Sequence, residues 1–264
     1  MKFSIITACY QRVSTLEGAI KSVLAQDYPE IEYIIVDGAS LDGSIDLIKR
    51  YAALTDSEEF KLQHPQFTFR YISEPDHGMY EALNKGIRMA TGDVIGLVHS
   101  DDFLYDRHVL SDIAAEFERT GADLVYGDGL FVNFNDIRKP VRNWIGGKYS
   151  KCKVKLGWLP LHPTCYICRE TQMKMGLYNE KYKIAADTDF LVRALYESNL
   201  KVTYLKRYII RMRMGGISTD SAKRKAMWKE DIAVYSSHGF LATPTKLMKM
   251  MWKVPQFISA KLKK

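Results

Sequence analysis

The chain has 264 residues, of which 47% are hydrophobic and 26% are charged. This composition is typical of a globular protein and excludes a collagen-like or coiled-coil chain. The length favours one large α/β domain with an appended segment, because one hydrophobic core seldom serves a longer chain. The longest apolar runs, at 33–36 and 94–98, fall far short of the ~20 residues that a membrane-spanning helix needs.

The beginning of the chain and its cysteines predict a cytoplasmic protein. A strand-like run starts at once, without a basic leader, a long apolar stretch and a cleavage site. Four cysteines without a disulfide framework suit a reducing compartment. Cys165 and Cys168 form a Cys-x-x-Cys pair, but zinc would need a second ligand pair, which the sequence lacks. We interpret the two as small apolar fillers of a buried segment.

The first half alternates strand-like and helix-like patterns, which predicts a mainly parallel sheet covered by helices. Ser14 and Glu17 have the spacing of a capping box, so a helix should begin there. The run 94–98 is the most continuous apolar strand and should be central in the sheet. The predicted strands are 3–7, 33–36, 67–72, 94–98 and 124–126, and the predicted helices are 14–26, one beginning at 44, 79–89 and 106–120.

The remaining segments are less regular. The polar stretch 55–66 is predicted to be a loop, and 133–161 is interpreted as a covering or acceptor-facing region. A short helix is predicted at 184–196 and strands at 202–205 and 208–212. From residue 201 onward 15 Lys plus Arg stand against 3 Asp plus Glu, whereas the first 200 residues hold 23 against 28. The stretch from 245 is basic and amphipathic, so it could lie on an anionic membrane surface.

Carboxylates follow two of the predicted strands. Asp101 and Asp102 come directly after the most buried strand, and Asp37 ends another apolar strand. Ligands of open α/β sheets bind beyond the carboxyl ends of strands, so these side chains should face a crevice. Two adjacent carboxylates there are costly without a cation, and Mg²⁺ or Mn²⁺ bridging to substrate phosphates would join them. The alternatives are a helix cap or solvated turn for the pair, and a simple turn at Asp37.

Several motifs of other enzyme classes are missing. No Gly-x-Gly-x-x-Gly follows a strand, and no Gly-x-x-x-x-Gly-Lys-Ser/Thr occurs, which argues against a dinucleotide-binding dehydrogenase and a P-loop nucleotidase. The absence of Gly-x-Ser-x-Gly removes the main support for a serine hydrolase.

Six segments, taken together and in order, resemble a family 2 glycosyltransferase of the GT-A fold. They are 3–10 (FSIITACY), 22–26 (SVLAQ), 34–44 (IIVDGASLDGS), 73–86 (SEPDHGMYEALNKG), 90–93 (ATGD) and 100–102 (SDD). The resemblance implies a Rossmann-like, mainly parallel but mixed sheet flanked by helices, with a C-terminal acceptor-side region and a basic helical extension. It suggests a glycosyltransferase domain at 1–215, with a nucleotide-sugar-binding half (1–130) and an acceptor-binding half (131–215), followed by the extension at 216–264.

The resemblance also implies roles for individual residues. The donor nucleotide would be held by Thr7, Tyr10 and Asp37, with Asp76 near it, and Asp101 and Asp102 would serve the ribose and the metal-diphosphate. Asp102 is the first choice for direct contact with Mn²⁺ or Mg²⁺. Two departures from the family pattern are Ala39, where a Gly is usual, and Leu41, where a small hydroxyl residue is usual.

Segments 162–164 (HPT) and 186–193 (ADTDFLVR) resemble the acceptor side of the family, where an acidic residue at a helix start is the general base. Asp187 matches that position best. Asp189 is the alternative, although it faces another side of the helix and has the spacing to pair with Arg193. His162 is interpreted as a packed or hydrogen-bonded histidine rather than an acceptor contact.

The resulting hypothesis is an inverting, metal-dependent transfer of a hexosyl or N-acetylhexosaminyl group from a nucleotide sugar, with UDP as the expected nucleotide. The acceptor would be a glycan or a lipid-diphosphate-linked molecule of cell-surface polysaccharide synthesis, used at the inner face of the membrane; nucleic acid is not expected. Because no Gln-x-x-Arg-Trp motif occurs, a non-processive enzyme is favoured. The alternatives are a sugar-nucleotide nucleotidyltransferase, which would need a basic Gly-rich phosphate loop near the N-terminus, and a non-catalytic protein of the membrane surface.

Overall fold

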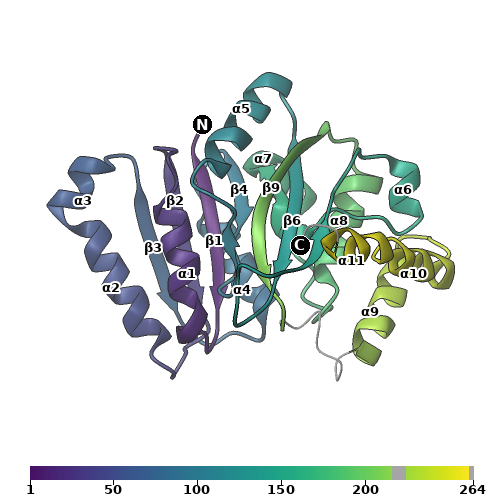
Figure 1. Cartoon of the computed structure of the whole chain (residues 1–264), viewed down its shortest axis with the longest axis horizontal. Coiled ribbons are helices and arrows are strands. Elements are labelled where there is room, and N and C mark those ends of the chain that lie inside the picture. Colours follow the sequence, from purple (N-terminus) through teal and green to yellow (C-terminus); the bar gives the residue numbers. More distant parts are fainter. Residues whose placement is uncertain (216–223, 262–264) are drawn as a thin grey trace.

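The computed structural model describes residues 1–215 and 224–261 and contains a nine-stranded mixed sheet flanked by helices (Figure 1). The strands are β1 (Phe3–Cys9), β2 (Ile31–Asp37), β3 (Thr68–Ser73), β4 (Val94–Leu97), β5 (Phe103–Leu104), β6 (Leu124–Val132), β7 (Pro140–Trp144), β8 (Cys165–Cys168) and β9 (Val202–Arg213). The helices are α1 (Val13–Leu24), α2 (Ser44–Asp56), α3 (Glu58–Gln63), α4 (Met79–Met89), α5 (Val109–Thr120), α6 (Lys151–Lys155), α7 (Arg169–Met175), α8 (Ala186–Val192), α9 (Arg224–Ser237), α10 (Ala242–Met251) and α11 (Val254–Lys261), with a 3₁₀ turn η1 (His162–Thr164) and a π-helical turn η2 (Arg193–Glu197).

The strand order is β3-β2-β1-β4-β8-β6-β9-β5, with β7 paired to β6. The first four strands of this order are parallel to one another, whereas β8 is antiparallel to both β4 and β6. The position of β4 in the middle of the sheet confirms the prediction made from its apolar run. The carboxyl ends of β1, β2 and β4 therefore lie along one edge.

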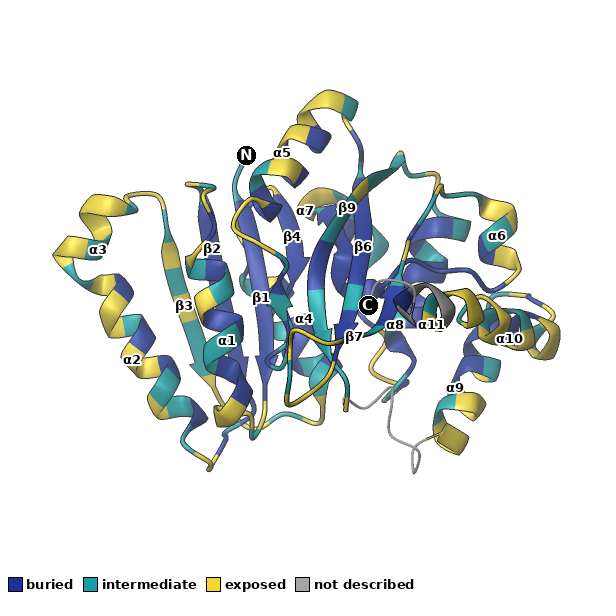
Figure 2. Cartoon of the chain, in the orientation of Figure 1, coloured by how far each residue is buried: buried dark blue, intermediate teal, exposed yellow. Residues whose placement is uncertain are grey.

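Figure 2 shows that the central strands are buried along most of their length, and alternate residues of these strands belong to two separate hydrophobic layers. On β1, Ile6 joins the layer that includes α4 and α8, and Ile5 joins the layer that includes α1 and α5. This division follows from the two-residue period of a strand with helices on both faces. All seven residues of β1 and of β2 are buried, so these strands hold their terminal side chains firmly.

Four local predictions are corrected by the structure. Ser14 does not cap α1: the helix begins at Val13, whose amide donates to the Asp42 carboxylate (2.9 Å), so the cap comes from another segment. The predicted loop 55–66 contains α3, whose first turn is capped by the Ser57 hydroxyl. The irregular stretch 133–161 contains β7 and α6, and the two strands predicted after residue 201 form the single strand β9.

The C-terminal helices α9, α10 and α11 lie at the right-hand edge of the molecule in Figure 1. The lysines of α10 face inward: the side chain of Lys246 is 6% exposed and that of Lys249 is 16% exposed. Leu247 and Met251 instead face solvent, at 50% and 63% exposure. The expectation that this segment presents its lysines to a surface is therefore wrong for Lys246 and Lys249. Lys263 and Lys264 lie outside the described residues.

Within the described parts of the chain, no helix combines the length and the apolar character needed to cross a bilayer. The four cysteines are free, and the predicted packing role is confirmed for Cys165, which is buried in β8. The boundary predicted at 130 falls inside β6, and the one at 215 follows the end of β9. The division of the chain into functional halves stays a prediction.

Candidate active site

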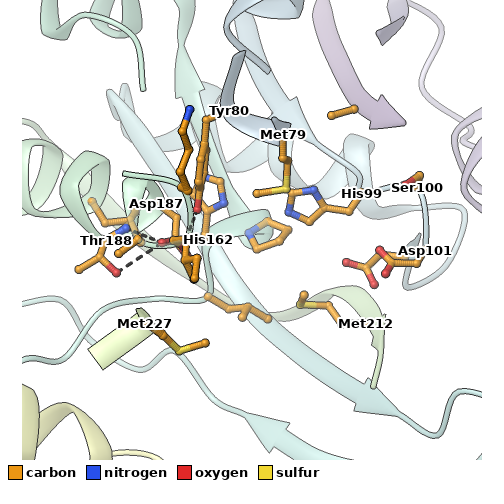
Figure 3. Close-up of a pocket in the computed structure, with 18 of the residues that line it drawn as sticks. Met79, Tyr80, His99, Ser100, Asp101, His162, Asp187, Thr188, Met212 and Met227 are labelled. Atoms are coloured by element: carbon orange, nitrogen blue, oxygen red, sulfur yellow. Dashed lines mark hydrogen bonds between the residues drawn. The ribbon is translucent and has the colours of Figure 1, made fainter. Parts of the chain in front are cut away.

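A cavity of about 450 Å³ opens beyond the carboxyl ends of β1 and β4 and is closed on the far side by the start of α8 and by the C-terminal helices. Asp101 lies at one end of it, whereas Asp187 and Thr188 lie at the other (Figure 3). His99 and His162 lie between these ends. The chain therefore brings acidic groups from residues 101 and 187, far apart in the sequence, to opposite ends of one cavity.

Asp102 is buried, with 1% exposure, and lines the cavity. Its Oδ1 accepts a hydrogen bond from the Arg213 amide (3.1 Å), but its Oδ2 has no partner among the residues that the structure describes. Burial and then the neighbouring Asp101 raise the pKa of this carboxyl well above its ordinary value. A buried carboxylate oxygen without a donor is unfavourable, so Asp102 has the character of a group that needs a ligand.

A divalent cation fits these residues. Asp101 and Asp102 supply hard carboxylate oxygens, the ligands that Mg²⁺ and Mn²⁺ prefer, and one of those oxygens lacks a partner. No group of three or more His, Cys, Asp or Glu side chains suited to a metal exists in residues 1–215 and 224–261. Substrate phosphates would therefore have to complete the shell of an ion held here, as they do for Mg²⁺ at many phosphate-transfer sites.

Tyr10 and Asp76 both line the cavity, and both lie close to Gly38. A Cβ at Gly38 would lie 2.7 Å from Asp76 Oδ2 and 3.1 Å from Tyr10 Cδ2, so a larger residue would push these two side chains from their present positions. Burial raises the pKa of Asp76, against a lowering effect of the Gly78 amide. Ala39 adopts a φ of +58°, which explains why a glycine is usual at this position.

Thr7 and Asp37 do not line the cavity, unlike the other residues predicted for the donor. The Thr7 hydroxyl donates to the Val98 carbonyl (2.6 Å), which ties β1 to the segment before Asp101. The Asp37 carboxylate accepts from the amide and hydroxyl of Ser40 (3.0 and 2.5 Å) and from the Ser73 hydroxyl (2.6 Å). In this structure both side chains hold together the segments around the cavity, and neither side chain belongs to the cavity wall.

Asp187 occupies the first turn of α8, on the cavity wall. Its Oδ1 accepts from the Thr188 amide (2.7 Å), and burial raises the pKa of the carboxyl. Asp189 points elsewhere: it pairs with Arg193 (3.0 Å), as its spacing predicts, and also with His238. Asp187 therefore remains able to accept a proton from a group in the cavity, whereas Asp189 is held in ion pairs outside it.

Residues 4–172 match the family model described as "Glycosyl transferase family 2". The chain belongs to glycosyltransferase family 2. A PGL/p-HBAD biosynthesis glycosyltransferase of Mycobacterium bovis is 28% identical over 206 residues, which are 77% of this chain and 73% of that protein. An uncharacterized glycosyltransferase of Mycobacterium tuberculosis is 30% identical over 199 residues, 72% of this chain and 68% of that one. Glycosyl transfer is thereby favoured over nucleotidyl transfer and over a non-catalytic role.

Two solved structures share the fold of this glycosyltransferase. The 1–349 fragment of TarS from S. aureus, in complex with UDP-GlcNAc, has a TM-score of 0.65 at 18% identity, over 89% of this chain and 66% of that fragment. A mannosyltransferase of Pyrobaculum calidifontis, in complex with GDP-Man and Mn²⁺, has a TM-score of 0.63 at 16% identity, over 98% of this chain and 73% of that one. The predicted GT-A fold with a helical extension is confirmed.

The Asp187 end of the cavity contains an ion-pair network that sequence reasoning missed. Asp231, on α9, is 2% exposed and binds Lys246 and Lys249, the second at 2.8 Å. Lys249 also donates to the Thr188 hydroxyl (2.9 Å). Burial alone would raise the pKa of Asp231, but Lys249 and Lys246 hold it at about 2. The only sequence signal was the pair of lysines three residues apart, and such a pair is equally typical of a helix face exposed to solvent.

The middle of the cavity is uncharged. His162 is buried, as predicted, and its Nε2 lies 2.7 Å from the Tyr178 hydroxyl; burial, with a smaller effect of His99, lowers its pKa to about 3. The pKa of His99 is also lowered by burial, against an opposing effect of Asp101. A sugar ring between the two ends would therefore meet neutral rings, while its charged neighbours lie at the ends.

Arg213 is a second residue that the sequence did not single out. It ends β9 and lines the cavity, where its amide holds Asp102 Oδ1 and its guanidinium donates to the Asp101 carbonyl (2.6 Å). The loop that carries the acidic pair is thus fastened by the last residue of a strand from the second half of the chain. The only feature of the sequence that could have pointed to Arg213 is its position at the end of a predicted strand.

Proposed function

We propose that this glycosyltransferase moves a sugar from a nucleoside-diphosphate sugar to an acceptor hydroxyl with inversion at the anomeric carbon. The observation that carries the proposal is one cavity with the unpartnered oxygen of Asp102 near one end and the raised-pKa carboxyl of Asp187 at the other. An inverting displacement needs a leaving-group site and a base on opposite sides of the reacting carbon. No covalent protein nucleophile is required.

Asp187 acts as the general base in this proposal. It takes the proton of the acceptor hydroxyl while that oxygen attacks the anomeric carbon, and the bond to the donor diphosphate breaks on the opposite side. Burial favours the protonated form of Asp187, which brings its pKa closer to the pH at which it must work. Lys249, through Thr188, holds the turn that carries this carboxyl.

The donor lies at the Asp101 end. Tyr10, Asp76 and Asp101 contact the nucleotide and ribose, while Thr7 and Asp37 hold the segments that carry them. Mn²⁺ or Mg²⁺ would be held by Asp102 and Asp101, and when bound it supplies positive charge to the departing diphosphate. UDP is the first nucleotide to test, and GDP is the second, since the two structural neighbours carry UDP-GlcNAc and GDP-Man.

The acceptor is a glycan or a lipid-linked molecule used at the inner face of the cell membrane, within the synthesis of a surface polysaccharide. The C-terminal helices support membrane contact by apolar rather than basic side chains, because Leu247 and Met251 of α10 are exposed whereas Lys246 and Lys249 of the same helix point inward. Exposed apolar side chains of this kind suit shallow binding to a bilayer. Sedimentation with anionic vesicles tests this: L247S/M251S should lose binding, and unchanged binding would remove the membrane from the proposal.

A thermal-shift panel tests the donor assignment. The full chain is heated with UDP, GDP and their sugar conjugates, each with and without Mn²⁺, because a ligand of the native state raises the melting temperature. We expect stabilisation by one nucleotide that increases with Mn²⁺ and is lost in D102N. Stabilisation by none of these ligands would contradict the proposed function.

A further inference from the structure

The acceptor end of the cavity has a basic corner formed by Arg142, Lys249 and Lys253. Arg142 lies on β7, and the two lysines belong to α10 and to the junction between α10 and α11. Lys249 belongs to the network around Asp187, and Lys253 lies close enough to Lys249 and to Arg142 for their charges to lower its pKa. The ion pair with Asp231 accounts for Lys249, but it accounts for neither Arg142 nor Lys253.

Arg142 is held in place, but none of the acidic side chains that the structure describes forms an ion pair with it. Its guanidinium lies over Trp144, Phe131 and Phe257, at 4.4, 4.8 and 5.2 Å from the ring centroids. Its Nε donates to Gln256 (2.7 Å), whereas its Nη2 is buried without a partner among the described residues. The side chain is 7% exposed, and burial lowers its pKa to about 10. An oriented guanidinium with a free donor is suited to an oxyanion.

Lys253 adds a second charge that the described part of the protein does not neutralise. Burial, together with the charges of Lys249, Arg142 and Lys246, lowers its pKa to about 8 against the opposing effect of Asp231. Asp231 is already bound to the two lysines of α10. The corner therefore holds two cations, Arg142 and Lys253, in excess of the acidic groups that face them.

We propose that Arg142 and Lys253 form an anion site that binds a phosphate group carried by the acceptor. Two unneutralised cations match a phosphate ester, whose charge at pH 7 is close to two, better than a carboxylate of charge one. A phosphate anchored here would place the rest of the acceptor beside Asp187, with the donor beyond it. This inference rests on the proposed function, because it assigns the basic corner to the acceptor of that reaction.

Calorimetry with hexyl phosphate as the probe tests the site in the full chain, with UDP and Mg²⁺ present at saturation. We expect hexyl phosphate to bind alongside UDP and to lose at least tenfold in affinity in Lys253→Gln. Lys253 is half-buried with no hydrogen bond to its ammonium among the described contacts, so this variant should fold. Lys155→Gln, which removes an exposed charge on α6 outside the cavity, is the matched control and should bind as the wild type does.

Arg142→Lys provides a second variant, which keeps the charge but removes the planar fork and should also weaken binding. Equal affinity in the wild type and in Lys253→Gln, or displacement of UDP by hexyl phosphate, would overturn the inference. Inorganic phosphate that binds as tightly as the ester would overturn the assignment to the acceptor. A wild type that binds no nucleotide at all would instead count against the proposed function.

The pH dependence gives an independent readout. Between pH 7 and pH 9 the affinity for hexyl phosphate should fall in the wild type, because Lys253 loses its proton near pH 8. Arg142 keeps its charge over most of this range, Asp231 stays ionised, and Asp231 keeps Lys249 protonated although burial opposes it. Lys253→Gln should show a flat profile, and a wild-type profile equally flat would contradict the role of Lys253.

Discussion

The two ends of the cavity each contain a buried carboxylate, but the fold gives the two carboxylates different partners. At the donor end, Asp101 and Asp102 are adjacent, and one buried oxygen of Asp102 has no partner among the described residues. Near the acceptor end, the carboxylate of Asp231 is bound by Lys246 and Lys249. Asp102 thus keeps an oxygen that a ligand can bind, whereas the charge of Asp231 is neutralised by two lysines of the protein itself. Buried acids near one cavity can thus serve binding or structure, and their hydrogen-bond partners tell the two apart.

The largest effect is expected from Asp187→Asn, which removes the base but keeps the shape of the side chain. The transfer rate should fall by about 10²–10⁴-fold, the usual contribution of a positioned base, while nucleotide binding at the donor end stays unchanged. Steady-state kinetics with a donor and an acceptor, together with a nucleotide thermal shift, measure both. A variant that turns over normally would remove Asp187 from its role.

Asp231→Asn tests whether the second acid is structural. Breaking a buried ion pair from one side commonly costs about 3–5 kcal/mol, because the remaining charges stay buried without a partner. We expect a loss of this size in the free energy of unfolding measured with urea. The matched control is Glu170→Gln, which removes the carboxylate from an exposed pair with Lys174 and should cost less than ~1 kcal/mol. Equal losses in the two variants would contradict the distinction between them.

Acid should weaken the same network. The folded pKa of Asp231 is about 2, below its ordinary value of 3.8, because Lys249 and Lys246 outweigh the effect of burial. A lowered pKa means that the stabilisation is present above the unfolded value and is lost as the pH falls through the folded value. Between pH 4 and pH 2 the wild type should therefore lose on the order of 2 kcal/mol more stability than Asp231→Asn. Parallel curves for the two proteins would show that Asp231 is not the group responsible.

The place of Asp101 and Asp102 on the cavity wall could be predicted from the sequence because its signals are contiguous. Asp101 and Asp102 directly follow an apolar run, and a side chain after a central strand has little choice of direction. Position alone did not reveal what surrounds Asp37, because its partners Ser40 and Ser73 come together only after β2 and β3 pair. The sequence therefore predicted that Asp101 and Asp102 line the cavity, but it did not predict which carboxylate oxygens are left without a hydrogen-bond partner among the described residues.

The acceptor end was harder to predict because an amphipathic pattern does not say which face is buried. In α10, lysines and apolar residues alternate, and burial of the lysines depends on Asp231 of α9. That carboxylate is near them only in the folded chain. The prediction for the start of α1 was wrong for a similar reason. The Asp42 carboxylate, from another segment, accepts the hydrogen bond at the helix start that was expected at Ser14. Contacts between segments decided both cases.

The smallest effect is expected from a substitution at Gly157, which tests whether the contact between Gly157 and α10 holds that helix in place. Gly157 has a φ of +77°, and a Cβ there would lie 2.4 Å from the backbone oxygen of Thr245 on α10. Gly147 has a φ of +69° with nothing within 4 Å, so Gly147→Ala carries the backbone strain alone. Gly157→Ala should destabilise by about 1–2 kcal/mol beyond Gly147→Ala, because α10 must shift to admit the methyl group. Since α10 also carries Lys249, its displacement should lower the transfer rate in Gly157→Ala, whereas Gly147→Ala should keep the wild-type rate. Equal stability and equal rates in the two variants would mean that α10 is not held in place through Gly157.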